Sequence, residues 1–216
     1  MNGYAFTLCG AGLVARPSGA LYWPEAGLLC VSDLHLGKSE RLARRGGVLL
    51  PPYETQATLE RLDADITATG ARRVICLGDS FDDDLAAEAI NEADRLWINR
   101  MMAGRDWTWI AGNHDPAAAI VGGSQRAEMH LGRLVFRHMA EPGASGEISG
   151  HYHPKAGLAG RTRPCFLIDA QRAILPAFGA YTGGLRCTDP VLRGLMQPPA
   201  IAVLTGRQAL PFPMPE

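Results

Sequence analysis

Four short motifs rich in metal-binding residue types follow one another along the chain. They are Asp33-Leu34-His35, Gly78-Asp79-Ser80-Phe81-Asp82, Gly112-Asn113-His114-Asp115 and Gly150-His151-Tyr152-His153. Carboxylate, amide and neutral imidazole groups provide the oxygen and nitrogen donors that suit divalent transition metals. Each motif follows an apolar run, and the ends of strands are where α/β proteins form their active sites. We therefore expect the four motifs to share one metal site.

The first two motifs place carboxylates at predicted strand ends. Asp33 and His35 are two residues apart, which on an extended segment directs both side chains to the same side, so one metal could bind both. Gly78 allows a sharp turn after its apolar run and exposes Asp79 as a carboxylate that could bridge two metals. Both aspartates are also typical of helix caps and turns, and this structural alternative stays open for each motif taken alone.

Three further acidic residues precede a predicted helix, at Asp82, Asp83 and Asp84. Acidic side chains are favoured at the positive, amino-terminal end of a helix, and we assign Asp83 and Asp84 to that structural role. We expect Asp82 to orient a metal ligand by hydrogen bonding.

The last two motifs combine imidazoles with other donors. Asn113 offers a neutral oxygen ligand, His114 an imidazole, and Asp115 a carboxylate that can orient this imidazole. His151 and His153 alternate, as expected for two ligands that reach neighbouring metals from one extended strand end. Ordinary turn chemistry and two structural histidines are the alternatives. The conjunction of all four motifs in this order favours the metal site.

Two histidines lie outside the motifs, and one of them can complete the site. His138 closes the apolar run Leu134–Phe136, whereas His130 precedes the turn Leu131-Gly132-Arg133. With His138, the site uses five of the six histidines in the chain. We therefore expect His138 to be a ligand and His130 to be left over.

Apolar periodicity indicates an α/β fold. Apolar runs of strand length precede the motifs. Apolar residues at helical spacing predict one helix between Pro51-Pro52 and Gly70 and another from Leu85 to Met101. The amino-terminal stretch from Tyr4 to Trp23 is typical of a hairpin or meander. After residue 130 the chain is predicted to be rich in strands. The expected strands are Leu28–Ser32, Val74–Leu77, Thr108–Ala111, Leu134–Phe136, Cys165–Ile168, Ala173–Leu175 and Ala200–Leu204.

These elements predict two packed sheets with helices outside. The chain of 216 residues is long enough for one well-buried domain and short for two. We expect a single domain over residues 1–216, with a peripheral carboxyl-terminal strand and Pro-rich tail from about residue 197.

Composition limits the setting. Lys and Arg number 21 against 22 Asp and Glu, so nucleic acid would have to be held by a local patch rather than by overall positive charge. The five cysteines lack any Cys-x-x-Cys pair and most lie in apolar runs, which is typical of buried free thiols. No signal peptide or membrane-spanning run is evident. We expect a reducing, cytoplasmic setting without membrane contact.

The order of the motifs resembles the calcineurin-like metallophosphoesterase superfamily. The resemblance implies an αββα sandwich of two mixed sheets and covers residues 28 to 154. Further segments resemble the bacterial DNA ligase-associated metallophosphoesterases. These are Gly37-Lys38, Leu50-Pro51-Pro52-Tyr53, Gly150-His151-Tyr152-His153-Pro154 and the stretch from Pro176 to Gly184.

The superfamily resemblance implies a role for each motif residue. One metal would be held by Asp33, His35 and His153, and the other by Asn113, His138 and His151, with Asp79 as the bridge. His114 would stay unligated for catalysis. The sequence departs from the family pattern at His138, which lacks the glycine often found beside that ligand.

The implied chemistry is hydrolysis of a phosphodiester in a nucleotide or nucleic acid, with a link to DNA repair and to partners such as a ligase. Two divalent ions, expected to be Mn²⁺ with Fe, Zn or Ni as alternatives, would activate water and neutralise phosphate oxygens. His114, oriented by Asp115, would protonate the leaving alkoxide.

Cations near the motifs are candidates for substrate binding. They are Lys38, Arg41, Arg44 and Arg45 after the first motif, and Lys155, Arg161 and Arg163 after the last. Lys38 and Lys155 are preferred because they lie closest in sequence to the ligands. Solvated surface charge is the alternative for each. A phosphomonoesterase, or a non-catalytic scaffold of this fold that binds repair proteins, are the alternative functions.

Overall fold

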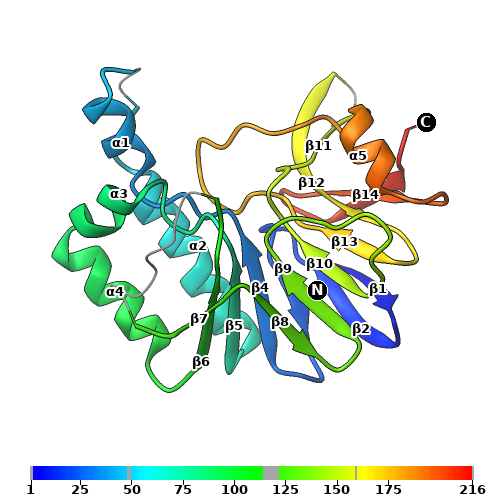
Figure 1. The fold of residues 1–216 in the computed structure, drawn as a ribbon, viewed down its shortest axis with the longest axis horizontal. Coiled ribbons are helices and arrows are strands. Elements are labelled where there is room, and N and C mark those ends of the chain that lie inside the picture. Colours follow the sequence, from blue (N-terminus) through cyan, green and yellow to red (C-terminus); the bar gives the residue numbers. More distant parts are fainter. Residues whose placement is uncertain (1, 48–49, 114–121, 159, 216) are drawn as a thin grey trace.

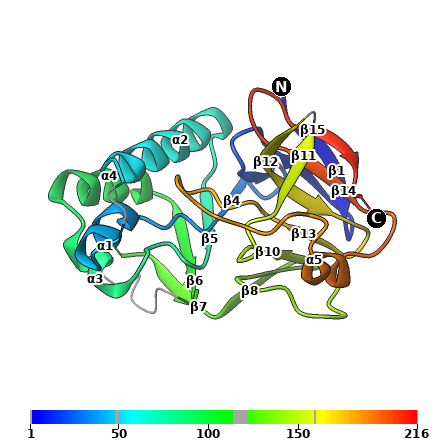
Figure 2. The same cartoon turned by 90° about the horizontal axis from the view of Figure 1, so that it is seen from above.

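Two β-sheets packed face to face form the centre of the molecule in the computed structural model (Figure 1). The structure describes residues 2–47, 50–113, 122–158 and 160–215. Helices α1 to α4 lie beside the first sheet, and α5 lies on the far side of the second (Figure 2). This arrangement confirms the α/β sandwich of two mixed sheets with flanking helices. None of the helices among the described residues is long and apolar enough to span a bilayer.

The first sheet begins as an antiparallel meander and becomes parallel. Its strand order is β1-β2-β3-β4-β5-β6-β7, and the parallel pairs start at β4. The strands span Tyr4–Leu8, Ala11–Ala15, Leu21–Trp23, Leu28–Ser32, Arg73–Leu77, Asp106–Ile110 and Ser124–Arg126. Since parallel strands end at the same edge, β4, β5 and β6 bring together the first two motifs and the described start of the third, Gly112-Asn113.

The second sheet comes from the carboxyl-terminal half. Its order is β15-β14-β12-β13-β10-β9-β8, and β11 pairs with β12 off this path. The strands are β8 Glu128–Leu131, β9 Leu134–Arg137, β10 Glu147–Ser149, β11 Lys155–Leu158, β12 Arg161–Ile168, β13 Arg172–Ile174, β14 Ile201–Leu204 and β15 Leu210–Pro213. The fourth motif therefore leaves β10 and enters β11.

Five helices accompany the sheets in the part of the chain that the structure describes. They are α1 Lys38–Arg44, α2 Glu54–Thr69, α3 Asp84–Ala89, α4 Glu92–Met102 and α5 Pro190–Leu195. The helix predicted after Pro51-Pro52 is α2, and Gly70 ends it in a left-handed conformation with φ of 61°. The single helix predicted from Leu85 to Met101 is wrong. It breaks at Ile90, because Asn91 caps α4 by accepting a hydrogen bond from the backbone N–H of Asp94.

Three apolar layers hold these elements together. Alternating residues of β4 point to opposite faces, so Leu28 and Cys30 lie between the sheets whereas Leu29 and Val31 face α2 and α4. The third layer covers the outer face of the second sheet beneath α5. Four of the five free cysteines are buried in these layers, as the sequence predicted.

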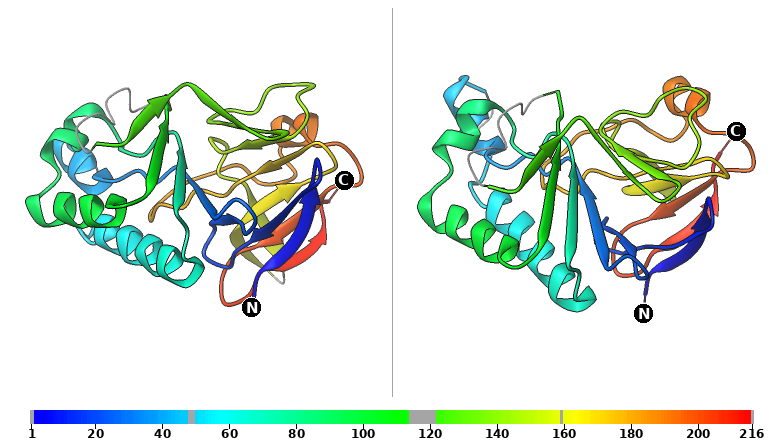
Figure 3. Two further views of the ribbon diagram at one scale, coloured as in Figure 1. Left: turned by 90° about the horizontal axis from the view of Figure 1, so that it is seen from below. Right: turned by 60° about the horizontal axis from the view of Figure 1, so that its bottom comes forward.

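The segment from residue 197 takes part in the second sheet. β15 is an edge strand, in line with a peripheral tail, but β14 lies between β12 and β15 and buries Ala202 and Val203 completely. Figure 3 shows these strands beside the amino-terminal ones. The backbone N–H of Ala209 donates to the carbonyl of Asn2 over 2.9 Å. The apolar run at Ala200–Leu204 thus contributes to the core rather than to a loose tail.

Candidate metal centre

The loops that carry the first two motifs run side by side beyond β4 and β5. The backbone N–H of His35 donates to the carbonyl of Asp79 over 2.9 Å, and that of Asp33 to Gly78 over 3.3 Å. Asp33, His35 and Asp79 have φ values of 54°, 46° and 45°. The extended exit predicted for Asp33 and His35 is therefore wrong, since left-handed residues turn both side chains toward the centre. Such backbone strain clusters at functional sites.

The fourth motif has the same unusual backbone. His151 and His153 have φ values of 69° and 47°, so the extended strand end predicted for them is also wrong. The backbone N–H of His151 donates to Asp33 Oδ2 over 2.9 Å, which joins this loop to the first motif. The Asp33 carboxylate thus supports the neighbouring loop and does not cap a helix.

Asp33, His35 and His153 form the first cluster. One ligand atom from each lies within 4.8 Å of the others. His153 Nε2 is 3.2 Å from Asp33 Oδ1 and 3.4 Å from His35 Nε2. Asp33 and His35 are buried. These are the three residues that the family resemblance implies for one metal.

Asp79, His138 and His151 form the second cluster, with the same 4.8 Å limit. His138 Nε2 is 3.1 Å from His151 Nδ1 and 3.5 Å from Asp79 Oδ2. The exposed Asn113 lies beside this cluster, with its side-chain nitrogen 3.5 Å from His151 Nδ1. His130 lies elsewhere, 67% exposed and paired with Glu128. The structure thus brings His138 and not His130 to the centre.

Hydrogen bonds on the outer side of two imidazoles fix their orientation. His35 Nδ1 is 2.8 Å from Asp82 Oδ1, and His138 Nδ1 is 2.9 Å from the carbonyl of Leu77. A protonated Nδ1 donates to each of these oxygens, so the Nε2 lone pair faces the cluster. The prediction that Asp82 contacts a ligand agrees with this contact.

The donor set fits divalent cations. Asp33 Oδ1 is buried and accepts no hydrogen bond from the residues that the structure describes, yet it lies against the His153 imidazole. A buried carboxylate oxygen without a donor is costly, and a cation between it and the imidazole lone pairs removes that cost. Oxygen and imidazole donors suit Mn, Fe, Zn or Ni rather than a soft metal.

The ionisable groups of the centre influence one another. Burial opposes protonation of His138, but the hydrogen bond with Asp79 and the charge of Asp33 outweigh it and raise its pKa to about 9. Burial and the neighbouring His138 charge lower the pKa of His151. A metal that binds His138 Nε2 must displace the proton there, so metal affinity falls as the pH falls below this pKa.

Burial raises the pKa of Asp82, but the hydrogen bond and charge of His35, with Lys38 and Arg41, outweigh it and lower the pKa overall. Asp82 therefore stays ionised beside His35.

Two glycines of the motifs are required by close approach. A Cβ at Gly150 would lie 1.6 Å from Ser32 Oγ, and one at Gly78 would lie 2.3 Å from His138 Nδ1. Both positions lie where backbone passes directly against a ligand or its neighbour. The glycines that open the second and fourth motifs therefore allow the loops to converge.

A segment that the sequence linked to the site only by resemblance also supports it. The backbone N–H groups of Phe178 and Gly179 donate to the carbonyls of Ser32 and Asp33 over 2.7 and 3.0 Å. A Cβ at Gly184 would lie 2.0 Å from the carbonyl of His153. We name residues 176–184 the strap, and it holds the backbone of the first cluster in place.

Arg61 is a contributor that sequence reasoning missed. Its guanidinium lies 4.5 Å from the centre of the Phe178 ring and donates to the Phe178 carbonyl. Arg61 thereby fastens the strap to α2. Its position on a predicted amphipathic helix gave no signal, because helical arginines are usually solvated.

The predicted substrate cations lie near the centre but have partners. Lys38 Nζ is 3.9 Å from Asp82 Oδ1, and Lys155 Nζ donates to the carbonyl of Thr182 over 2.9 Å. The segment after the first motif begins with helix α1. Its arginines pair with acidic residues, Arg41 with Asp82 and both Arg44 and Arg45 with Asp83. Asp83 also caps α3, as the sequence predicted.

The predicted catalytic pair, His114 and Asp115, lies outside the described residues. The residue described just before them is Asn113, which lies next to the second cluster.

Comparison with solved structures finds a protein that is similar over nearly the whole chain. It is described as the crystal structure of Pseudomonas putida nuclease MPE. The two sequences are 30% identical, the match covers 98% of this chain and 100% of that chain, and the TM-score is 0.77. No protein-family model and no curated protein matches. The two-sheet sandwich is thus a calcineurin-like fold, shared with a nuclease.

Proposed function

Because the chain belongs to the metallophosphoesterase family of this nuclease, we propose that it is a phosphodiesterase that uses two divalent metal ions and cleaves nucleic acid. The observation that carries the proposal is the pair of adjacent clusters, each with a carboxylate and two imidazoles. Within the superfamily we favour the ligase-associated subgroup, because the segments quoted above resemble it. Membership of that subgroup would imply a role in DNA repair and a DNA ligase as partner.

The proposed residue assignments are supported by the geometry and the resemblance together. Asp33, His35 and His153 would hold one metal, and Asn113, His138 and His151 the second, with Asp79 as the bridge. When bound, two such ions polarise the phosphate and activate water for in-line attack. We favour Mn²⁺ as the native ion, since hard carboxylate and amide oxygens balance the imidazoles.

The protein's own groups supply the remaining steps. The left-handed backbone at both aspartates, together with the strap, holds the ligands before substrate binds, so no reorganisation is needed during reaction. His114, positioned by Asp115, is proposed to donate a proton to the leaving alkoxide oxygen. Lys38 and Lys155 are proposed to contact substrate phosphate oxygens through the hydrogen atoms that their present partners leave available.

The proposed organisation is one catalytic domain over residues 1–216. The proposed setting is the cytoplasm, because the five free cysteines suit a reducing compartment.

The deciding experiment measures metal content and turnover in matched histidine variants. We expect the wild type, reconstituted with Mn²⁺, to bind two metals and to cleave bis-p-nitrophenyl phosphate and a DNA oligonucleotide. His138→Ala should lose one metal and nearly all turnover, whereas His130→Ala should keep both, because only His138 lies in the second cluster. Fewer than one bound metal in the wild type would overturn the proposal. Cleavage of monoesters alone would replace it with a phosphomonoesterase.

A further inference from the structure

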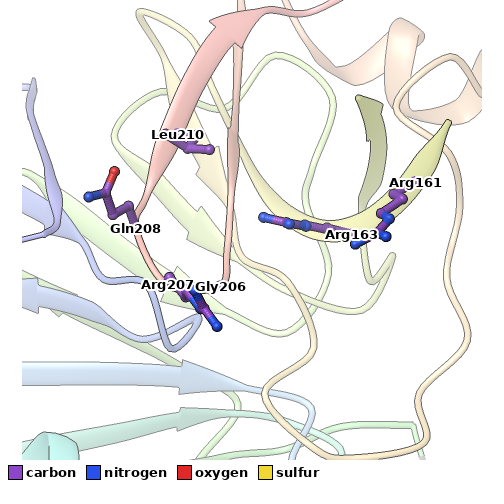
Figure 4. Close-up of a pocket in the computed structure, with 6 residues that line it drawn as sticks. All are labelled: Arg161, Arg163, Gly206, Arg207, Gln208 and Leu210. Atoms are coloured by element: carbon purple, nitrogen blue, oxygen red, sulfur yellow. The ribbon is translucent and has the colours of Figure 1, made fainter. Parts of the chain in front are cut away.

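A pocket lined by three arginines lies on the second sheet. Its volume is about 690 Å³, and it is lined by Arg161, Arg163, Gly206, Arg207, Gln208 and Leu210. Figure 4 shows Arg161 and Arg163 on β12 and Gly206 and Arg207 in the turn between β14 and β15. We propose that this pocket binds a phosphate of the nucleic-acid strand at a distance from the phosphate that is cleaved.

The charges in the pocket are not neutralised. Arg161, Arg163 and Arg207 form no ion pair with any residue that the structure describes. The arginines of α1, by contrast, all have carboxylate partners, and that segment is closer in sequence to the first motif. Three guanidinium groups without counter-charge repel one another, and a phosphate between them relieves that repulsion while accepting several hydrogen bonds.

The pocket is built by close fitting of two elements. Thr205 donates to the carbonyl of Pro164 through both its backbone N–H and its hydroxyl, each over 3.0 Å. A Cβ at Gly206 would lie 3.3 Å from Arg163 Nη1, so the glycine lets the guanidinium lie against the turn. Arg161 and Arg163 are two residues apart on one strand and therefore project from the same face. Two of the arginines are thus presented by β12, and the turn that carries Arg207 is held against that strand by the hydrogen bonds of Thr205.

The register of β11 and β12 limits the distance to the metal centre. Arg163 pairs with Ala156, which follows His153 by three residues. A chain spans at most about 3.6 Å per residue and paired strands lie about 5 Å apart, so the Cα atoms of Arg163 and His153 lie within about 16 Å. A stacked strand rises about 3.4 Å per nucleotide, which places the pocket within about five nucleotides of the cleaved bond.

This inference rests on the proposed nuclease function and identifies the substrate as a strand of several nucleotides. A dinucleoside monophosphate has a single phosphate, which would lie at the clusters, so it cannot place a second phosphate in the pocket. The affinity for longer strands should therefore depend on the arginines and on salt concentration, since each phosphate contact releases counterions.

The test compares Arg161→Gln/Arg207→Gln, which changes two exposed side chains, with the same variant carrying Arg163→Gln in addition. Arg100→Gln is the matched control, because Arg100 is 69% exposed and pairs with Asp63 on the helical side of the molecule. For a 12-mer DNA strand, the double variant should raise KM at least about 10-fold and lower the salt dependence of binding, as a log–log slope, by about 1.4. The control should match the wild type. KM for a dinucleoside monophosphate should rise less than twofold in every variant.

The outcomes separate the two proposals. If the wild type cleaves the 12-mer and the double and triple variants retain its KM and salt slope, the pocket proposal is wrong and the nuclease proposal stands. If the wild type cleaves neither substrate with Mn²⁺, the nuclease proposal is wrong. An equal rise in KM for both substrates would show damage to the metal centre and would also overturn the pocket proposal.

Discussion

The two clusters have the same ligand types but are supported in different ways. In the first cluster, His35 is oriented by the Asp82 carboxylate, which is itself held by Lys38 and Arg41. In the second, His138 is oriented by the backbone carbonyl of Leu77. Side-chain support can be weakened by a single substitution that leaves the backbone unchanged. Main-chain support can be disturbed only by changing the path of the chain.

This difference predicts unequal sensitivity of the two metals. The affinity for the metal in the first cluster should fall by an amount that depends on how strongly the charge around Asp82 is changed. The metal in the second cluster should stay bound through such changes and should be lost when the backbone near Gly78 is moved. Given the proposed ligand assignments, substitutions near Gly78 and Asp82 test that contrast.

The largest effect is expected for Gly78→Ala. Its Cβ would lie 2.3 Å from His138 Nδ1 and 2.8 Å from Gly112 Cα, and its φ of +70° is unfavourable for alanine. His138 must leave the second cluster, so one metal and nearly all turnover should be lost. Gly70→Ala is the matched control, because Gly70 has a φ of +61° but nothing within 4 Å of the added Cβ. Equal loss of metal in both variants would mean that strain alone, and not the His138 contact, is responsible.

His114→Ala should separate binding from chemistry, because the proposal places His114 in neither cluster. Metal content should be unchanged, while turnover of a DNA strand falls roughly 10²–10⁴-fold, the usual range for a positioned general acid. The loss should shrink for a nitrophenyl diester, whose leaving group needs little protonation. Loss of metal, or equal losses on both substrates, would contradict the general-acid role.

A smaller effect is expected for Asp82→Asn. Asparagine keeps the size of the side chain but removes the charge that holds His35, so affinity for the first metal should fall roughly 10–100-fold while the second is retained. Metal titration followed by calorimetry would resolve the two sites. Asp83→Asn is the control, since asparagine also caps helices and Asp83 contacts no ligand of either cluster. An equal fall in metal affinity at both sites would show that the two clusters are not supported in different ways.

The smallest effect is expected for Arg41→Gln. Arg41 contacts only the far oxygen of Asp82, so its loss raises the pKa of that carboxyl and loosens His35 indirectly. The affinity of the first cluster for its metal should fall only several-fold. Arg44→Gln, which removes pairs with Glu40 and Asp83, should have no effect on metal titration. An Arg41 effect as large as that of Asp82→Asn would show that the ion pair, and not the His35 hydrogen bond, supports the site.

Much of this architecture could be predicted because strand ends and glycines have strong local signals. Apolar runs located β4, β5, β6 and β9 to within two residues, and a glycine opens the second and fourth motifs where backbones approach closely. His138 was preferred over His130 because it follows an apolar run, and the structure places it at the end of β9, beside Asp79 and His151.

Features that depend on tertiary contact could not be predicted. Left-handed Asp33 and His35 break the alternation rule, and contacts from loops distant in sequence, such as the one at Asp79 and the strap, stabilise them. The break before Asn91 was hidden because Leu85, Trp97 and the residues between them continue a helical pattern through it. Arg207 lies 44 residues beyond Arg163 in sequence, so their meeting follows from sheet order alone.

Each cluster takes residues from both sheets, and this has a consequence for folding. Asp33, His35 and Asp79 follow strands of the first sheet, whereas His138, His151 and His153 follow strands of the second. Ions bound there act as cross-links between two layers that otherwise meet through apolar packing. By thermodynamic linkage, metal bound there would raise the unfolding temperature, so a chain deprived of metal would open and be degraded sooner.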